Sequence, residues 1–92
     1  DIADVNLDNL LSALAKKEFT TVKNWVVQHM DNDPSSVMRK IYDSLYGVLK
    51  PPSIPEAVLI MAKYMKDITL VPDQEINMLA CLTEIMMSCE FK

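Results

Sequence analysis

Glycine is nearly absent from this chain, because Gly47 is the only glycine among the 92 residues. A loop that cradles a phosphate needs several glycines so that backbone N–H groups can close around the anion. Basic residues are also few, since nine Lys and Arg stand against thirteen Asp and Glu and give a net charge of −4 at pH 7. Binding to duplex DNA draws its affinity from Lys and Arg that neutralise phosphates. The composition therefore argues against ATP binding by such a loop and against direct contact with DNA.

Cysteines and long apolar runs are scarce as well. Cys81 and Cys89 lie about 12 Å apart along one expected helix, so they cannot form a disulfide without unfolding it. Free thiols suit a reducing compartment, and the sequence shows no signal-peptide pattern. No apolar run reaches the roughly 18 residues that a membrane-spanning helix needs. We therefore expect a protein of the cytoplasm that has no membrane partner.

The residues that usually carry chemistry are also sparse. His29 is the only histidine, and no cysteine or carboxylate stands at a spacing typical of a metal site or a catalytic pair. The sequence offers no paired acids and no nucleophile with an adjacent base. We expect no catalytic residue, no cofactor and no metal in this chain, and therefore no enzyme activity of its own.

The apolar residues predict a single all-α domain. Half of the residues are hydrophobic and 24% are charged, which is sufficient for one compact core. The apolar positions recur at helical spacing nearly everywhere, and sustained alternation with the period of a strand is absent. The pattern predicts a five-helix bundle, with helices at about 7–14, 19–30, 34–49, 53–67 and 73–89.

Capping residues and prolines mark the ends of these helices. Asp4 and Asn6 are candidate N-caps of the first helix, and Asp33 followed by Pro34 is a strong start signal for the third. The two prolines after Lys50 must end that helix.

The fourth helix is expected to begin with a capping box. Ser53 and Glu56 have the spacing of a capping box. In this motif the serine oxygen and the glutamate side chain each accept a hydrogen bond from an unpaired backbone N–H at the start of the helix. Apolar residues cover most of the circumference of this helix, so we expect it to be the central one.

The last helix has more apolar surface than a surface helix needs. Ten of the fourteen residues from Ile76 to Cys89 are apolar, which gives an apolar arc of roughly 240° against about 100° for a core face. No Lys or Arg occurs from Asp67 to Phe91. One interpretation is that this helix is simply the innermost helix of the bundle. We favour the other, in which part of it packs against a neighbouring subunit.

This second interpretation predicts particular interface positions. On the last helix they include Met78, Cys81, Leu82, Ile85 and Cys89. Trp25, Tyr42 and Tyr46 are second-choice contacts because amphipathic aromatic residues are common hot spots, although each fits the edge of a core equally well.

The order of segments resembles a known family. A short leucine helix comes first, and Lys16-Lys17-Glu18-Phe19 then leads into a helix that contains Trp25. A long helix that ends before prolines follows, then the segment 58–65, and finally Asp73-Gln74-Glu75-Ile76-Asn77-Met78-Leu79-Ala80-Cys81-Leu82. This order and wording resemble the C-terminal collar domain of AAA+ clamp-loader ATPase subunits, in particular those of T-even bacteriophages. The resemblance covers essentially the whole chain.

The resemblance implies a scaffold function. In this family, collar domains assemble into a ring of five that holds the ATPase modules, and the machine places a sliding clamp on primer-template DNA during DNA replication. The chain is then expected to be the C-terminal piece of a longer ATP- and Mg²⁺-dependent subunit in the cytoplasm of an infected bacterium. Its implied partners are other copies of that subunit and a dissimilar clamp-loader subunit. The catalytic motifs of the family lie upstream, so the resemblance assigns no catalytic residue here.

Two other functions remain open. The seven methionines fit a free-standing helical module that binds a partner helix in an adaptable groove. The tripeptide Asp43-Ser44-Leu45 also resembles the phosphopantetheine attachment site of acyl carrier proteins, which predicts modification at Ser44. In that family the serine opens a helix, whereas Ser44 falls about ten residues into an expected helix.

Overall fold

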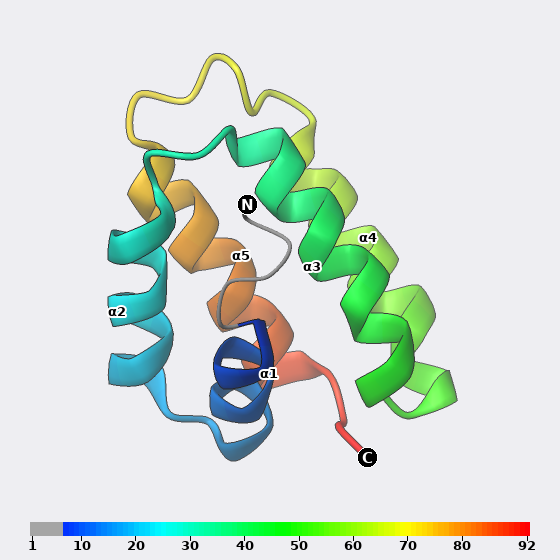
Figure 1. Ribbon diagram of the computed structural model, residues 1–92. Helices are drawn as coiled ribbons and strands as arrows, with labels where there is room; N and C mark the ends of the chain where they lie inside the picture. Colours follow the sequence, from blue (N-terminus) through cyan, green and yellow to red (C-terminus); the bar gives the residue numbers. More distant parts are fainter. Residues whose placement is uncertain (1–6) are drawn as a thin grey trace.

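Helices form nearly all of the regular structure in residues 7–92, the part of the chain that the computed structural model describes (Figure 1). The described elements are α1 (Leu7–Lys16), α2 (Phe19–His29), α3 (Pro34–Val48), the 3-10 helix η2 (Pro51–Ser53), α4 (Ile54–Met65) and α5 (Gln74–Ser88). The predicted all-α class and the number of α-helices are confirmed. The candidate N-caps Asp4 and Asn6 lie outside the described residues.

Aspartate caps begin the two longest helices. Asp33 Oδ2 accepts a hydrogen bond of 3.0 Å from the backbone N–H of Ser36, and Pro34 occupies the first helical position of α3. Asp73 Oδ1 accepts a hydrogen bond of 3.0 Å from the N–H of Ile76 at the start of α5. The Asp33 cap was predicted as such, whereas for the last helix only a start at about residue 73 was predicted. Such starts can be predicted because a short carboxylate reaches an N–H three residues ahead without help from any distant segment.

The predicted capping box at the start of α4 is wrong. The Ser53 side chain makes no capping hydrogen bond within α4, and its hydroxyl instead accepts one of 2.8 Å from the backbone N–H of Glu90. The C-terminal segment runs beside this turn, where the N–H of Lys50 donates to the carbonyl of Glu90 over 2.9 Å. A long-range partner has therefore replaced the local one.

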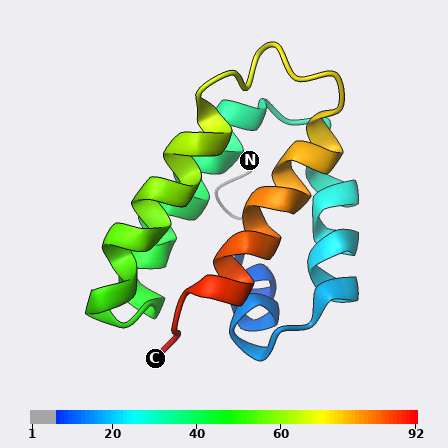
Figure 2. The same ribbon diagram turned by 180° about the vertical axis from the view of Figure 1, so that it is seen from behind.

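The central helix is α5, not α4 as the sequence predicted. Helix α5 contacts each of the other four α-helices, and from behind it lies between α4 and α2 (Figure 2). Helix α4 buries Ala57, Ile60 and Met61 but exposes Val58 and Leu59. The rest of the chain therefore buries only part of the wide apolar surface of α4.

A left-handed residue joins α1 to α2 and ties this pair to α5. Lys17 has φ of 59°, and the N–H of Glu18 donates to the carbonyl of Ala13 over 2.9 Å, which closes α1 in a Schellman motif. The Lys17 ammonium then donates to the carbonyl of Met86 over 2.7 Å, in the last turn of α5. A cation at the C-terminal end of a helix stabilises the exposed carbonyls there.

Candidate subunit interface

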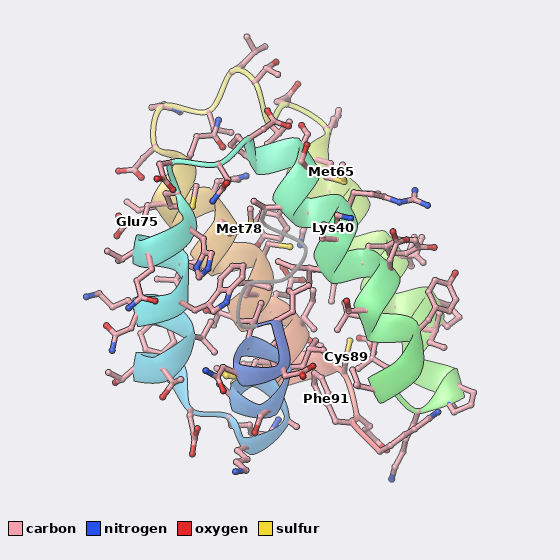
Figure 3. All side chains as sticks on the ribbon, viewed as in Figure 1. Lys40, Met65, Glu75, Met78, Cys89 and Phe91 are labelled. Carbon is pink, nitrogen blue, oxygen red and sulfur yellow. The ribbon has the colours of Figure 1, made fainter. Side chains whose placement is uncertain are left out.

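The five interface positions predicted on α5 all lie in the core of the chain. Met78, Cys81, Leu82, Ile85 and Cys89 are buried, and Figure 3 shows Met78 and Cys89 among the helices. These side chains have no surface to offer a neighbour, because α1, α2, α3 and α4 already pack around α5. The interpretation of α5 as the innermost helix therefore accounts for most of its apolar arc.

The three aromatic candidates divide between core and surface. Trp25 is buried and stacks on His29, with ring centroids 4.1 Å apart, while His29 Nδ1–H donates to the Trp25 carbonyl over 2.7 Å. Tyr46 is exposed and Tyr42 is half-buried, and their hydroxyls form a hydrogen bond of 2.7 Å. Trp25 is thus a core residue, while the two tyrosines remain available for contact.

The surplus apolar surface of α5 lies along a groove against α2. We call this surface the α2–α5 groove; it has a volume of about 410 Å³ and is lined by Phe19, Ile76, Leu79, Ala80, Thr83, Glu84 and Met87. Ile76 is 65% exposed and Met87 is 67% exposed. Because Ile76, Ala80, Thr83 and Met87 are spaced by three or four residues, they form one stripe along the helix. The stripe leaves large hydrophobic side chains in solvent, while the opposite face of the same helix is buried in the core.

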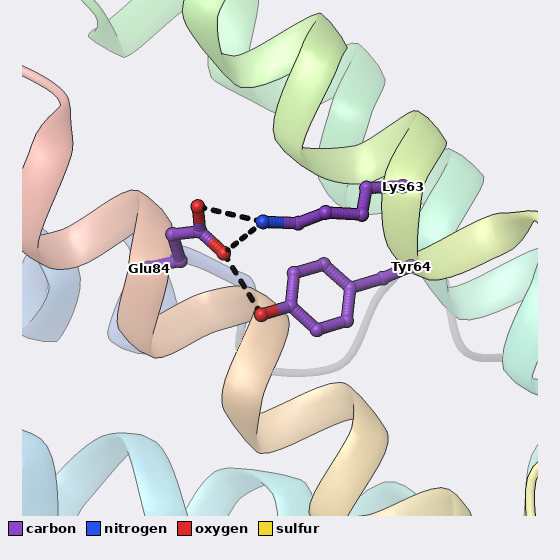
Figure 4. Close-up of polar contacts among 3 residues, drawn as sticks. All are labelled: Lys63, Tyr64 and Glu84. Carbon is purple, nitrogen blue, oxygen red and sulfur yellow. Dashed lines mark hydrogen bonds and ion pairs between the residues drawn. The ribbon is translucent and has the colours of Figure 1, made fainter.

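A polar cluster between α4 and α5 borders this groove (Figure 4). The Lys63 ammonium lies 2.9 Å from each carboxylate oxygen of Glu84. The Tyr64 hydroxyl donates to Glu84 Oε1 over 2.8 Å, and the Asn77 amide donates to the Tyr64 carbonyl over 3.4 Å. The polar side of α5 therefore faces α4, which turns the exposed apolar stripe outward.

The ion pair of this cluster predicts a specific pH dependence. The hydrogen bond from Lys63, followed by that from Tyr64, lowers the pKa of Glu84, and the bond to Glu84 raises the pKa of Lys63. A lowered carboxyl pKa stabilises the fold above the ordinary value of 4.5, and this contribution is lost as pH falls through the lowered value. A raised ammonium pKa acts below 10.5, and its contribution is lost as pH rises through the raised value.

We therefore expect Glu84→Gln to weaken the dependence of stability on pH on the acid side. The measurement is the urea midpoint of unfolding between about pH 3 and pH 8. Glu75→Gln, which removes an exposed carboxylate from the same helix but leaves the Lys63–Glu84 pair in place, is the matched control. If the urea midpoints of the wild type and of Glu84→Gln fell in parallel as the pH is lowered, this result would contradict the stabilising role of the Lys63–Glu84 pair.

A second apolar surface lies on α3 and α4. A groove of about 220 Å³ is lined there by Arg39, Tyr42, Val58, Met61, Ala62 and Met65. Leu59 is 73% exposed and precedes Ala62 by three residues, so the two are neighbours on the surface of α4. Tyr46 adjoins this groove through its bond to Tyr42. We call these residues together the α3–α4 surface.

The described residues give no support to a carrier-protein site, a metal site or a membrane-spanning helix. Ser44 lies well inside α3 and is half-buried, so it does not open a helix as the carrier-protein serine does. Within residues 7–92 there is no group of three or more His, Cys, Asp or Glu side chains placed to hold a metal ion. None of the helices described in that range is both long and apolar enough to cross a membrane.

The fold and this surface define a small helical bundle with an exposed apolar groove beside its central helix. No protein-family model matches the chain, and no curated protein sequence matches it.

Proposed function

We propose that this domain is the collar of a clamp-loader ATPase subunit and that it holds the subunits of that machine together. The observation that carries the proposal is the α2–α5 groove, in which Ile76 and Met87 stay exposed although the opposite face of α5 is buried in the core. The resemblance of the segment order to AAA+ clamp-loader collars supports it. In this role the domain contributes to loading a sliding clamp onto primer-template DNA without touching the DNA itself.

The chemistry of the groove suits a lasting contact. Covering a side chain such as Ile76 or Met87 stabilises an interface by about 1.5–3 kcal/mol for complete burial. Interfaces that persist are more apolar than transient ones and have fewer charges at their centre. A scaffold that must stay assembled through each cycle of ATP hydrolysis needs a surface of this kind. The proposed partners are other copies of the subunit and one dissimilar clamp-loader subunit.

A competition experiment tests this function. The 92-residue chain is added in excess to purified clamp-loader subunits of a T-even bacteriophage, and ATP hydrolysis stimulated by clamp and primer-template DNA is measured. We expect the added chain to occupy collar positions and to lower the stimulated rate. The Met87→Glu variant, which places a carboxylate in the groove, should compete at least about tenfold less well. Hydrolysis that is unaffected by excess chain would contradict the proposal.

The α2–α5 groove also fits the alternative of a free-standing module that binds a partner helix. Both functions use the same residues, but they differ in what fills the groove. A chain that stays monomeric, leaves clamp-loader activity unchanged and binds amphipathic peptides would favour the alternative.

A further inference from the structure

We infer that residues 89–92 form a strap that opens and closes at one end of the bundle while the five helices stay folded. We call this segment the 89–92 strap. It follows the last residue of α5 and runs beside the end of α3 and the η2 turn, as Figures 1 and 3 show. All of its contacts lie within one chain, so the strap works in the same way whether or not the domain is a collar.

Short backbone pairing holds the strap to the end of α3. The N–H of Lys50 donates to the carbonyl of Glu90, and the N–H of Lys92 donates to the carbonyl of Val48, each over 2.9 Å. Water replaces such bonds when a segment opens, so each adds little net stability. The ion pair of Lys50 with Glu90 also adds little, because its contact of 3.6 Å joins two side chains that are more than half exposed.

Ser53 fastens the strap from the η2 turn. Its hydroxyl accepts a hydrogen bond of 2.8 Å from the N–H of Glu90, and only 6% of the residue is exposed. The Cys89 thiol lies 3.8 Å from the Ser53 carbonyl oxygen. Because Ser53 makes no capping hydrogen bond in α4, its hydroxyl serves the strap and not the helix. An N–H that loses its partner in a partly buried place is costly, so Ser53 determines how firmly the strap is closed.

Helix α5 keeps its own contacts when the strap moves away. The Lys17 ammonium binds the carbonyl of Met86 in the last turn, from the side of α1 and α2. Ile85 and Met86, the last buried residues of α5, pack in the core. Segments with few buried contacts open at a lower free energy than the whole domain. The strap can therefore open while α5 stays helical.

The closed strap encloses Leu49 and Cys89. Leu49 is completely buried and forms an antiparallel bridge with Phe91, while Cys89 is 4% exposed. Phe91 is half-buried and lines a groove of about 320 Å³ between α1 and α3. Opening of the strap therefore widens this groove and brings the Cys89 thiol into contact with solvent. The Cys81 thiol stays inside the core until the whole bundle unfolds.

Alkylation of the two thiols by iodoacetamide at increasing urea concentrations below the unfolding transition tests the strap. The rate at each cysteine is read separately by mass spectrometry of its peptide. Opening of the strap exposes little surface, whereas global unfolding exposes much, and sensitivity to urea scales with that surface. We expect the rate at Cys89 to be nearly independent of urea at low concentration, and the rate at Cys81 to rise steeply throughout.

Two variants separate the local from the global opening. Ser53→Ala weakens the closed strap and should raise the rate at Cys89 in low urea about fivefold. Val26→Ala makes a cavity on α2, which lies on the other side of the bundle from the strap (Figures 1 and 2). It should raise the rate at Cys81 about tenfold or more and leave the rate at Cys89 in low urea unchanged.

Glu90→Ala is the matched control for the strap itself. It removes the exposed ion pair with Lys50 but keeps the backbone N–H that Ser53 binds, so the rate at Cys89 should stay within about twofold of the wild type. Far-UV circular dichroism confirms that each variant is folded.

Two outcomes would overturn the inference. If the rates at Cys89 and Cys81 rise with urea at the same slope in the wild type, the strap opens only together with the whole bundle. If Ser53→Ala leaves the rate at Cys89 unchanged, the serine does not hold the strap closed. Neither outcome bears on the proposed scaffold function, which the competition experiment with clamp-loader subunits decides separately.

Discussion

Replacing Ile85 with Glu is expected to unfold this chain rather than to detach it from a neighbour. Ile85 is completely buried on α5, at the centre of the bundle. The substitution removes apolar burial and brings a carboxyl group into the core, which together cost at least about 4 kcal/mol. A domain of this size has a free energy of unfolding of about 5–15 kcal/mol, so the loss takes most or all of it.

The measurement is urea unfolding followed by far-UV circular dichroism. Met87→Glu introduces the same group two residues further along the same helix, where the side chain is exposed. Its unfolding free energy should stay within about 0.5 kcal/mol of the wild type. If Ile85→Glu and Met87→Glu lowered the free energy of unfolding equally, this result would contradict the difference between the buried and the exposed face of α5.

The thiols of the folded chain are expected to be nearly inert. Burial, followed by the nearby charge of Glu84, raises the pKa of Cys81 from 9.0 to about 12. Because the thiolate is the reactive form, this shift lowers its population near neutral pH by about a thousandfold. Burial also raises the pKa of Cys89. Both side chains are in addition enclosed by the core, which keeps reagents away from the sulfur atoms.

Reaction with a chromogenic aromatic disulfide at about pH 8 measures this protection. The folded chain should react only as fast as it opens, whereas both cysteines should react at once in guanidinium chloride. Ser88→Cys provides the control, because it adds an exposed thiol to the same helix that should be modified immediately. Modification of Cys81 in the native chain at the rate of this added thiol would contradict its burial.

The ends of the helices could be predicted from the sequence because local chemistry determines them. Asp33 and Pro34 start α3, and the prolines that follow Lys50 stop it, wherever the rest of the chain lies. The five-helix pattern depends on the same short-range rules. These features are therefore reproduced in the structure within a few residues.

The direction in which α5 faces could not be predicted in the same way. An apolar arc of roughly 240° indicates that most of the helix is covered, but it does not say which part is left over. The packing of the buried residues of α5 against four other helices sets that orientation. The contact of Glu84 with Lys63 and Tyr64 accompanies it, and it joins residues about 20 positions apart. The exposed residues Ile76 and Met87 could have been found only by assuming that the polar side of α5 faces another helix.

The lost capping box has a similar cause. Ser53 matches the local pattern in full, yet its hydroxyl binds the N–H of Glu90, which is 37 positions away. Local and long-range partners compete for the same oxygen atom, and the sequence shows only the local one. The C-terminal segment crosses the η2 turn, and this crossing decides the outcome.

The central claim is that the α2–α5 groove, not the buried face of α5, is the surface through which this domain associates. Sedimentation velocity of the wild type, Met87→Glu and Leu70→Glu at matched concentrations tests it most directly. Leu70→Glu is the control, because it alters a residue that is 78% exposed in the loop between α4 and α5, outside the groove. The account predicts that the wild type and Leu70→Glu sediment faster as concentration rises, while Met87→Glu keeps the mass of a folded monomer. Association of Met87→Glu that equals that of the wild type would contradict the claim.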